Sequence, residues 1–329
     1  MVKGKMTFGK GYISLVIALF LYTQASAWGF YGHRLINRMS VYLLPPEMMV
    51  LYKPNIEFII EHAIDPDKRR YAVNGEAPRH YIDLDRYGIY PYPDMPREWN
   101  LAVAKWTEDT LQAHGIVPWW TQTMLRRLTD AFIAKDQLRI LRLSADIGHY
   151  IGDAHVPLHA CSNYNGAQTD QVGIHGFWES RIPELFAETD YDFFIGKAGY
   201  IEKPGDFIWN RVLESAAAAD TVLKSEAVLN ARFSPDRKYA YEERLGKIVR
   251  QYSTAYSRAY TNMLNGMVER RMRQTIFAVA SFWYTAWVNA GQPDLRNLIN
   301  RSMTEQEQTE YDELNKQWQT GKAIGKICE

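Results

Sequence analysis

Residues 149–179 read HYIGDAHVPLHACSNYNGAQTDQVGIHGFWE and hold four of the eight histidines in the chain. Two pairs of potential ligands in this stretch are each four residues apart, namely His149 with Asp153 and His175 with Glu179. On a helix, residues at this spacing share one face. A single such pair is more often a surface hydrogen bond or a helix cap. Two pairs, with His159 between them, favour a metal site, and imidazole nitrogen with carboxylate oxygen is a ligand set that suits zinc.

Residues 1–27 have the features of a secretory signal peptide. A positive start is followed by the apolar run 13–22 and by Ala25-Ser26-Ala27, an A-x-A cleavage pattern. The apolar run is about half of the roughly 20 residues that a membrane-spanning helix needs, which disfavours a membrane anchor. We therefore expect cleavage between Ala27 and Trp28, and a mature domain of residues 28–329 that is secreted or periplasmic.

Composition limits the classes of partner and of fold. The chain has 38 basic and 38 acidic side chains, so no strong general attraction to polyanions is expected. Its two cysteines, Cys161 and Cys328, exclude a dense disulfide framework but leave one bridge open. Apolar residues make up 47% of the sequence, which is enough for a sizeable core.

Helical periodicity dominates the chain, and no stretch alternates with period two for long, so we expect an all-α single domain without a sheet of any size. The predicted helices are 97–114, 118–135, 137–153, 174–187, 206–231, 237–268, 270–290 and 303–319. The run Thr275–Ala290 is uncharged but short for a membrane span, so it predicts a buried central helix. The Gln/Glu-rich helix that ends the chain should be solvated.

Two further segments carry candidate ligands. In residues 62–85, HAIDPDKRRYAVNGEAPRHYIDLD, we select Asp65 and His80. We expect the remaining candidates of that segment to be caps or solvated charges, namely His62, Asp67, Asp83 and Asp85. At the expected mature terminus, the α-amine and carbonyl of Trp28 stand five residues before His33 and could chelate a metal with it. Alone, His33 is better explained as part of the first turn of an amphipathic helix that runs to Leu44.

Taken together, these positions resemble the zinc-dependent phospholipase C and single-strand-specific zinc nuclease superfamily. The shared pattern is a processed terminal Trp28, then His33, then an Asp and a His fifteen residues apart, then H-x3-D-x5-H and H-x3-E. It covers most of the mature chain in order. The resemblance implies an all-helical domain with three zinc ions at the bottom of a cleft. Its ligand assignments are Asp65, His80, His149 and Asp153 for one zinc, Trp28, His33 and Asp153 for a second, and His159, His175 and Glu179 for the third.

The chemistry that the resemblance implies is phosphodiester hydrolysis by a zinc-activated water. Asp65 would orient that water or take its proton. Glu179 and the short interval from His159 to His175 resemble the ligand pattern of the phospholipases. The short Trp28–His33 spacing resembles the pattern of the nucleases.

We place a phospholipase C-like monomer acting on a phospholipid headgroup first. A single-strand-specific endonuclease that releases 5'-phosphonucleotides is the alternative. In either case Tyr81 is a candidate substrate contact, by stacking on a base or by cation–π contact with a choline-like headgroup, or it simply packs in the core. A non-catalytic helical binding protein, stabilised by zinc, is the alternative of another class.

Overall fold

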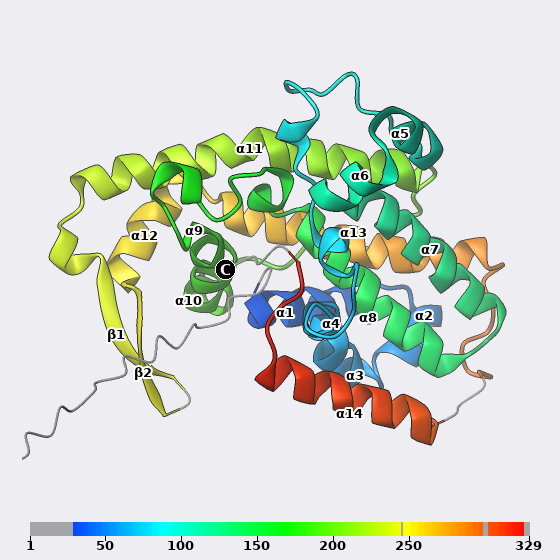
Figure 1. The fold of residues 1–329 in the computed structure, drawn as a ribbon. Coiled ribbons are helices and arrows are strands. Elements are labelled where there is room, and N and C mark those ends of the chain that lie inside the picture. Colours follow the sequence, from blue (N-terminus) through cyan, green and yellow to red (C-terminus); the bar gives the residue numbers. More distant parts are fainter. Residues whose placement is uncertain (1–28, 245, 299–301, 326–329) are drawn as a thin grey trace, which may run out of the picture.

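The structure is a computed structural model that describes residues 29–244, 246–298 and 302–325 (Figure 1). The predicted signal peptide, Trp28 and Cys328 lie outside these ranges. The longer helices are α1 (Gly29–Val41), α7 (Val117–Ile133), α8 (Gln137–Ala154), α11 (Pro204–Arg232), α12 (Thr254–Met263), α13 (Met267–Asn289) and α14 (Glu305–Thr320). The shorter helices are α2 (Pro46–Tyr52), α3 (Ile56–Glu61), α4 (Asp65–Arg69), α5 (Trp99–Trp106), α6 (Glu108–His114), α9 (Ile174–Gly176) and α10 (Ile182–Asp190). Single turns that matter for the site are η1 (His62–Ile64), η2 (Ala77–His80), η4 (Pro157–Ala160) and η6 (Phe177–Arg181).

Helix α13 lies in the centre of the bundle, where it contacts α1, α7 and α8 (Figure 1). Phe282 and Trp283 are completely buried, and the indole nitrogen of Trp283 donates to the Ser144 carbonyl of α8 at 2.9 Å. The prediction of a buried central helix in this region is confirmed. Within the described ranges, no helix combines the length and the apolar character that crossing a bilayer would need.

Helices α1 and α8 cross at very short range because α8 carries Gly148 at the crossing. A Cβ at this position would lie 2.1 Å from Oδ1 of Asn37 on α1. Asn37 instead uses the free space to donate from Nδ2 to the Ala145 carbonyl at 3.1 Å. This crossing places the face of α1 that carries His33 directly against the face of α8 that carries His149.

The mostly helical single domain agrees with the sequence prediction, with two local corrections. The predicted helix 97–114 is divided between α5 and α6 at Thr107, whose φ is +64°. The predicted helix 237–268 is wrong in its first half, which forms an antiparallel hairpin of β1 (Tyr239–Arg244) and β2 (Lys247–Tyr252). Gly246, with a φ of +74°, supplies the turn that helical periodicity does not reveal.

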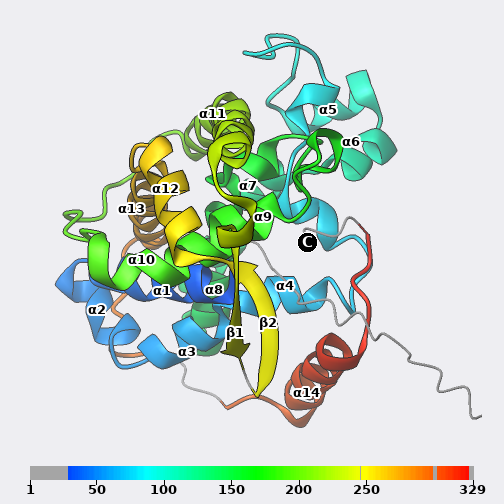
Figure 2. The same cartoon turned by 90° about the vertical axis from the view of Figure 1, so that its left-hand side faces the viewer.

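The hairpin is anchored on the segment that follows α9 (Figure 2). The ring of Tyr252 stacks on that of Phe177 with centroids 3.8 Å apart, and Arg181 forms an ion pair with Glu242. The hairpin therefore braces η6, the turn that carries Glu179.

Candidate metal centre

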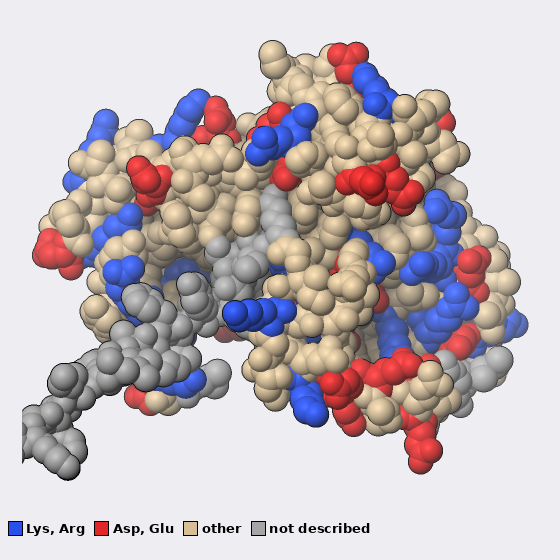
Figure 3. Space-filling model, in the orientation of Figure 1, with Lys and Arg blue, Asp and Glu red and all other residues tan. Residues whose placement is uncertain are grey.

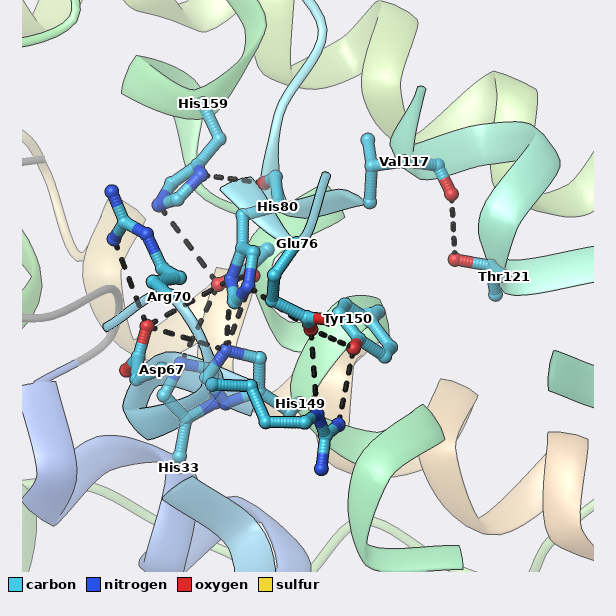
Figure 4. Close-up of polar contacts among 12 residues, drawn as sticks. His33, Asp67, Arg70, Glu76, His80, Val117, Thr121, His149, Tyr150 and His159 are labelled. Atoms are coloured by element: carbon cyan, nitrogen blue, oxygen red, sulfur yellow. Dashed lines mark hydrogen bonds and ion pairs between the residues drawn. The ribbon is translucent and has the colours of Figure 1, made fainter. Parts of the chain in front are cut away.

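Three groups of buried side chains each bring nitrogen and oxygen atoms within 4.8 Å of one another. The groups are His80 with His149 and Asp153, His159 with His175 and Glu179, and His33 with Asp67 and His149. They are called here the first, second and third triads. Their members come from α1, α4, η2, α8, η4, α9 and η6, and Figure 4 shows several of these side chains converging. A single turn of chain could not supply such a set, so the fold itself assembles it.

The first triad has the dimensions of a coordination shell. Nε2 of His149 lies 3.1 Å from Nδ1 of His80 and 3.4 Å from Oδ2 of Asp153, and the His80 and Asp153 atoms are 2.9 Å apart. Ligands at the usual distances from a tetrahedral zinc are about 3.3 Å from each other. The remaining nitrogen of His149, Nδ1, lies 2.9 Å from the Ala63 carbonyl and donates to it, which fixes the ring with Nε2 toward the triad.

The second triad repeats this arrangement. Nε2 of His175 lies 3.1 Å from Nε2 of His159 and 2.9 Å from Oε2 of Glu179, and the latter two atoms are 3.5 Å apart. Nδ1 of His159 donates to the His80 carbonyl at 2.7 Å, so its Nε2 also faces inward. Glu179 lies on η6, which has π-helical geometry, a local widening that is frequent at functional sites.

The third triad is the loosest and lies beside the first, with which it shares His149. Oδ1 of Asp67 is 3.6 Å from Nε2 of His149. The His33 ring stacks on that of His149, and its Nε2 lies 3.4 Å from Oδ1 of Asp153. The two oxygens of Asp153 thus face different histidines, His80 and His149 on one side and His33 on the other.

The residues present fit a bound cation. Both ring nitrogens of His33, both carboxylate oxygens of Asp67 and Oδ1 of Asp153 are buried and make no hydrogen bond within the described part of the chain. Leaving buried polar atoms without such bonds costs about 1–3 kcal/mol each. A divalent cation would satisfy the carboxylates and the lone pairs of the imidazoles together, and each triad could therefore hold one metal ion.

The electrostatics favour the ligand forms of several of these groups. Burial alone would raise the pKa of Asp153, but the facing His149 and His159 outweigh it and hold that pKa well below its ordinary range. Burial lowers the pKa of His33 and of His159, which keeps both rings neutral. For His149, burial is outweighed by the carboxylates of Asp153 and Asp67, which raise its pKa to about 9. Cation binding there would displace a proton.

A buried carboxylate supports the outer side of the first triad. Glu76 is fully buried, and its Oε1 lies 3.7 Å from Nε2 of His80. It also contacts Tyr150 and Arg79. Burial opposes ionisation of Glu76, but His80 and Arg69 outweigh it and lower its pKa. Glu76 thus remains charged beside His80, a buried carboxylate that the sequence analysis missed.

The placement of Asp65 differs from the sequence prediction, which chose it over Asp67. The Asp65 carboxylate bonds to Nδ1 of His62 at 2.5 Å and to Nζ of Lys68 at 3.0 Å, whereas Asp67 joins His33 and His149. The two aspartates are two positions apart on α4, so they point to nearly opposite sides of the helix. Asp67 is also buried, contrary to the expectation of a cap or a solvated charge.

The predicted substrate contact, Tyr81, is buried beside the start of α7. Its hydroxyl donates to the Ala113 carbonyl at 3.4 Å, and its ring lies against Gly115. Stacking on a substrate would require this side chain to leave its present packing. The other predicted ligands among the described residues, His33, His80, His149, Asp153, His159, His175 and Glu179, all lie in the triads.

Comparison with known proteins adds no identification. No family model and no curated protein sequence matches the chain. The geometry of the triads is therefore what indicates the function of this protein.

Proposed function

We propose that the protein is a zinc-dependent phosphoric diester hydrolase of the phospholipase C type, with zinc sites at the first triad, at the second triad and at His33, Asp67 and Asp153 beside the first. The observation that carries this proposal is the position of Asp153, whose two oxygens face the histidines of two neighbouring triads. Two cations that share one carboxylate lie close together, and such a pair lowers the pKa of a bound water and neutralises phosphoryl oxygens.

The protein groups around this position suit diester hydrolysis. Oδ1 of Asp67 lies 3.6 Å from His149 and 3.8 Å from His80, at the edge of both triads. From there it can orient a water or hold its proton, and it takes the role that the sequence analysis gave to Asp65. Nη1 of Arg70 lies 3.8 Å from the same Asp67 oxygen, and this buried guanidinium can bind a phosphoryl oxygen.

Charge distribution supports a phospholipid ahead of a nucleic acid. Basic side chains gather on the right of the face drawn in Figure 3, around α7 and α8, and over the rest of that face they are interspersed with acidic ones, without a continuous basic track. Proteins that bind polyanions usually neutralise several phosphates at once with such a track. A single headgroup phosphate needs only the local charges of the centre. Endonuclease activity on single strands is the second candidate, supported by the spacing of Trp28 and His33.

Maturation is part of the proposal. Cleavage before Trp28 would create an α-amine five residues before His33, in a secreted or periplasmic protein. Gly29, the first residue of α1, lies close to the second triad, because a Cβ there would be 2.5 Å from Oγ of Ser180, the neighbour of Glu179. The start of α1 is therefore packed against the turn that carries a ligand of the second triad.

The deciding experiment uses mature protein 28–329, with its zinc content measured by elemental analysis. Phosphatidylcholine vesicles, single-stranded DNA and RNA are assayed side by side, before and after chelation and zinc return. Release of diacylglycerol and phosphocholine that depends on zinc supports the phospholipase proposal. Nucleotide products alone would favour the nuclease. Bound zinc without turnover of any diester would indicate the non-catalytic binding protein.

A further inference from the structure

The carboxyl-terminal part of the described chain lies across the short helix that carries Asp67. It consists of α14 and residues 321–325, called here the terminal strap, and Figures 1 and 2 show it running beside α4. None of the residues of α14, all of which are described, is buried. The helix is held against α4 by half-buried side chains, Tyr311 and Trp318 among them.

One lysine of α4 connects the two helices. The ammonium of Lys68 lies 5.4 Å from the ring centroid of Tyr311 and 5.8 Å from that of Trp318, two residues seven positions apart on α14. The same ammonium lies 3.0 Å from Oδ1 of Asp65, and the Lys68 side chain is only 7% exposed. A desolvated cation held against aromatic faces is the setting in which cation–π contacts are strongest.

The strap also contacts the end of α4 and the turn that follows it. The amide of Ile324 donates to the Arg70 carbonyl at 2.6 Å, and Gly325 lies against Ala77, where a Cβ on the glycine would be 2.9 Å from that of the alanine. The strap therefore contacts Lys68 and Arg70, which follow Asp67 by one and three residues.

A third contact reaches the first turn of α1. The ring of Trp318 lies with its centroid 5.4 Å from that of Phe30, one helical turn before His33. The ring of Tyr311 lies 5.1 Å from that of His62, the partner of Asp65. The strap thus touches both elements that supply the third triad from outside α8.

From these contacts we infer that the terminal strap is a positioning element of the metal centre. It holds α4 in the orientation that directs Asp67 toward His33 and His149. Helix α4 has only five residues and is too short to be stable by itself, so its orientation depends on what is packed against it. The second triad makes no use of α4, and its metal should not depend on the strap. This inference rests on the proposed metal centre.

The test is zinc binding by full mature protein, measured by elemental analysis and by titration against a competing chelator. We expect Trp318→Leu, Tyr311→Leu and Lys68→Met to lose one zinc per chain, with an affinity for that zinc lower by about 10–100-fold, the usual effect of supports around a metal ligand. Trp318→Phe and Lys68→Arg keep a ring and a cation, and should retain most of the binding. Gln319→Leu, on the exposed side of α14, is the matched control and should bind as the wild type does.

A double substitution separates positioning from general stability. In an Asp67→Asn background, Trp318→Leu should cause no further loss of zinc, because the two changes act on the same ligand. Equal loss of all zinc ions, or additive loss in the double variant, would overturn the positioning role while leaving the metal centre intact. Full zinc content in all three strap variants would also overturn the positioning role and leave the metal centre intact. A wild-type protein that binds no zinc would overturn both proposals.

Discussion

The imidazole rings of His33 and His149 stack with their centroids 3.8 Å apart and their planes 15° from parallel. Both rings are buried, and they belong to helices that lie far apart in the sequence. Two protonated rings could not remain in such a stack, because their charges would repel each other in a medium of low dielectric constant. The candidate metal centre therefore depends on the crossing of α1 and α8. At least one of the two stacked rings, His33 or His149, must be neutral.

Asp153→Asn tests the shared carboxylate. The amide keeps the shape of the side chain but removes the charge that faces His80, His149 and His33, so zinc content should fall and the remaining affinity should drop by about 100-fold or more. Elemental analysis and diester hydrolysis are measured together. Asp130→Asn, at an exposed position of α7, is the control for loss of a carboxylate. Normal turnover by Asp153→Asn would remove this residue from the proposed centre.

Asp65 and Asp67 should respond differently to the same substitution. Asp67→Asn should reduce hydrolysis by about 100-fold or more, as expected for loss of a proton acceptor, with a small effect on the unfolding of metal-free protein. Asp65→Asn breaks the bonds with His62 and Lys68 and should lower the free energy of unfolding by about 1–3 kcal/mol. Activity measured at a temperature at which both variants are folded distinguishes them. If Asp65→Asn lost more hydrolytic activity and Asp67→Asn more stability, Asp65 would be the ligand, as the sequence analysis predicted.

Gly148→Ala tests the close crossing of α1 and α8. The added Cβ would lie 2.1 Å from Oδ1 of Asn37, so the helices must separate and the free energy of unfolding should fall by about 1–3 kcal/mol. Chemical denaturation of metal-free protein measures this change. Adding Asn37→Ala to Gly148→Ala removes the clashing amide and should recover part of the loss. If the double variant is simply the sum of the two single variants, the clash is not the cause.

Acid sensitivity of the metal-free protein should depend on His155. Burial lowers the pKa of this side chain from 6.5 to about 3. It therefore stays neutral in the folded protein while it becomes protonated in the unfolded chain. Above pH 6.5 the ring is neutral in both states and does not affect the free energy of unfolding. As the pH falls from 6.5 toward 3, the free energy of unfolding decreases by up to about 1.4 kcal/mol per pH unit.

The measurement is the free energy of unfolding of metal-free protein, by urea denaturation from pH 8 to pH 4. His155→Gln cannot take up the proton, so its stability should decline less steeply than that of the wild type below pH 6.5. Each protein is compared with itself at pH 8, which removes the effect of the substitution on packing. Parallel curves for the two proteins would exclude His155 as a source of the acid sensitivity.

The spacing of residues in the sequence predicted most members of the three triads. His175 and Glu179 are four residues apart, and their ligand atoms lie 2.9 Å apart, because one helical turn determines that geometry locally. The choice between Asp65 and Asp67 could not be made this way. Both flank Pro66, and which of them points inward depends on how a five-residue helix is turned by its neighbours. The hairpin was missed because its strands are short and its turn depends on Gly246.

His80 contributes two different atoms to two different triads. Its Nδ1 belongs to the first triad, while its backbone carbonyl accepts the hydrogen bond that orients His159 in the second. Any shift of this residue is transmitted to both, so occupation of one should pre-align the other. Loading of these two triads would then be cooperative, and molecules with only one of the two filled would be scarce even when the ion is in short supply.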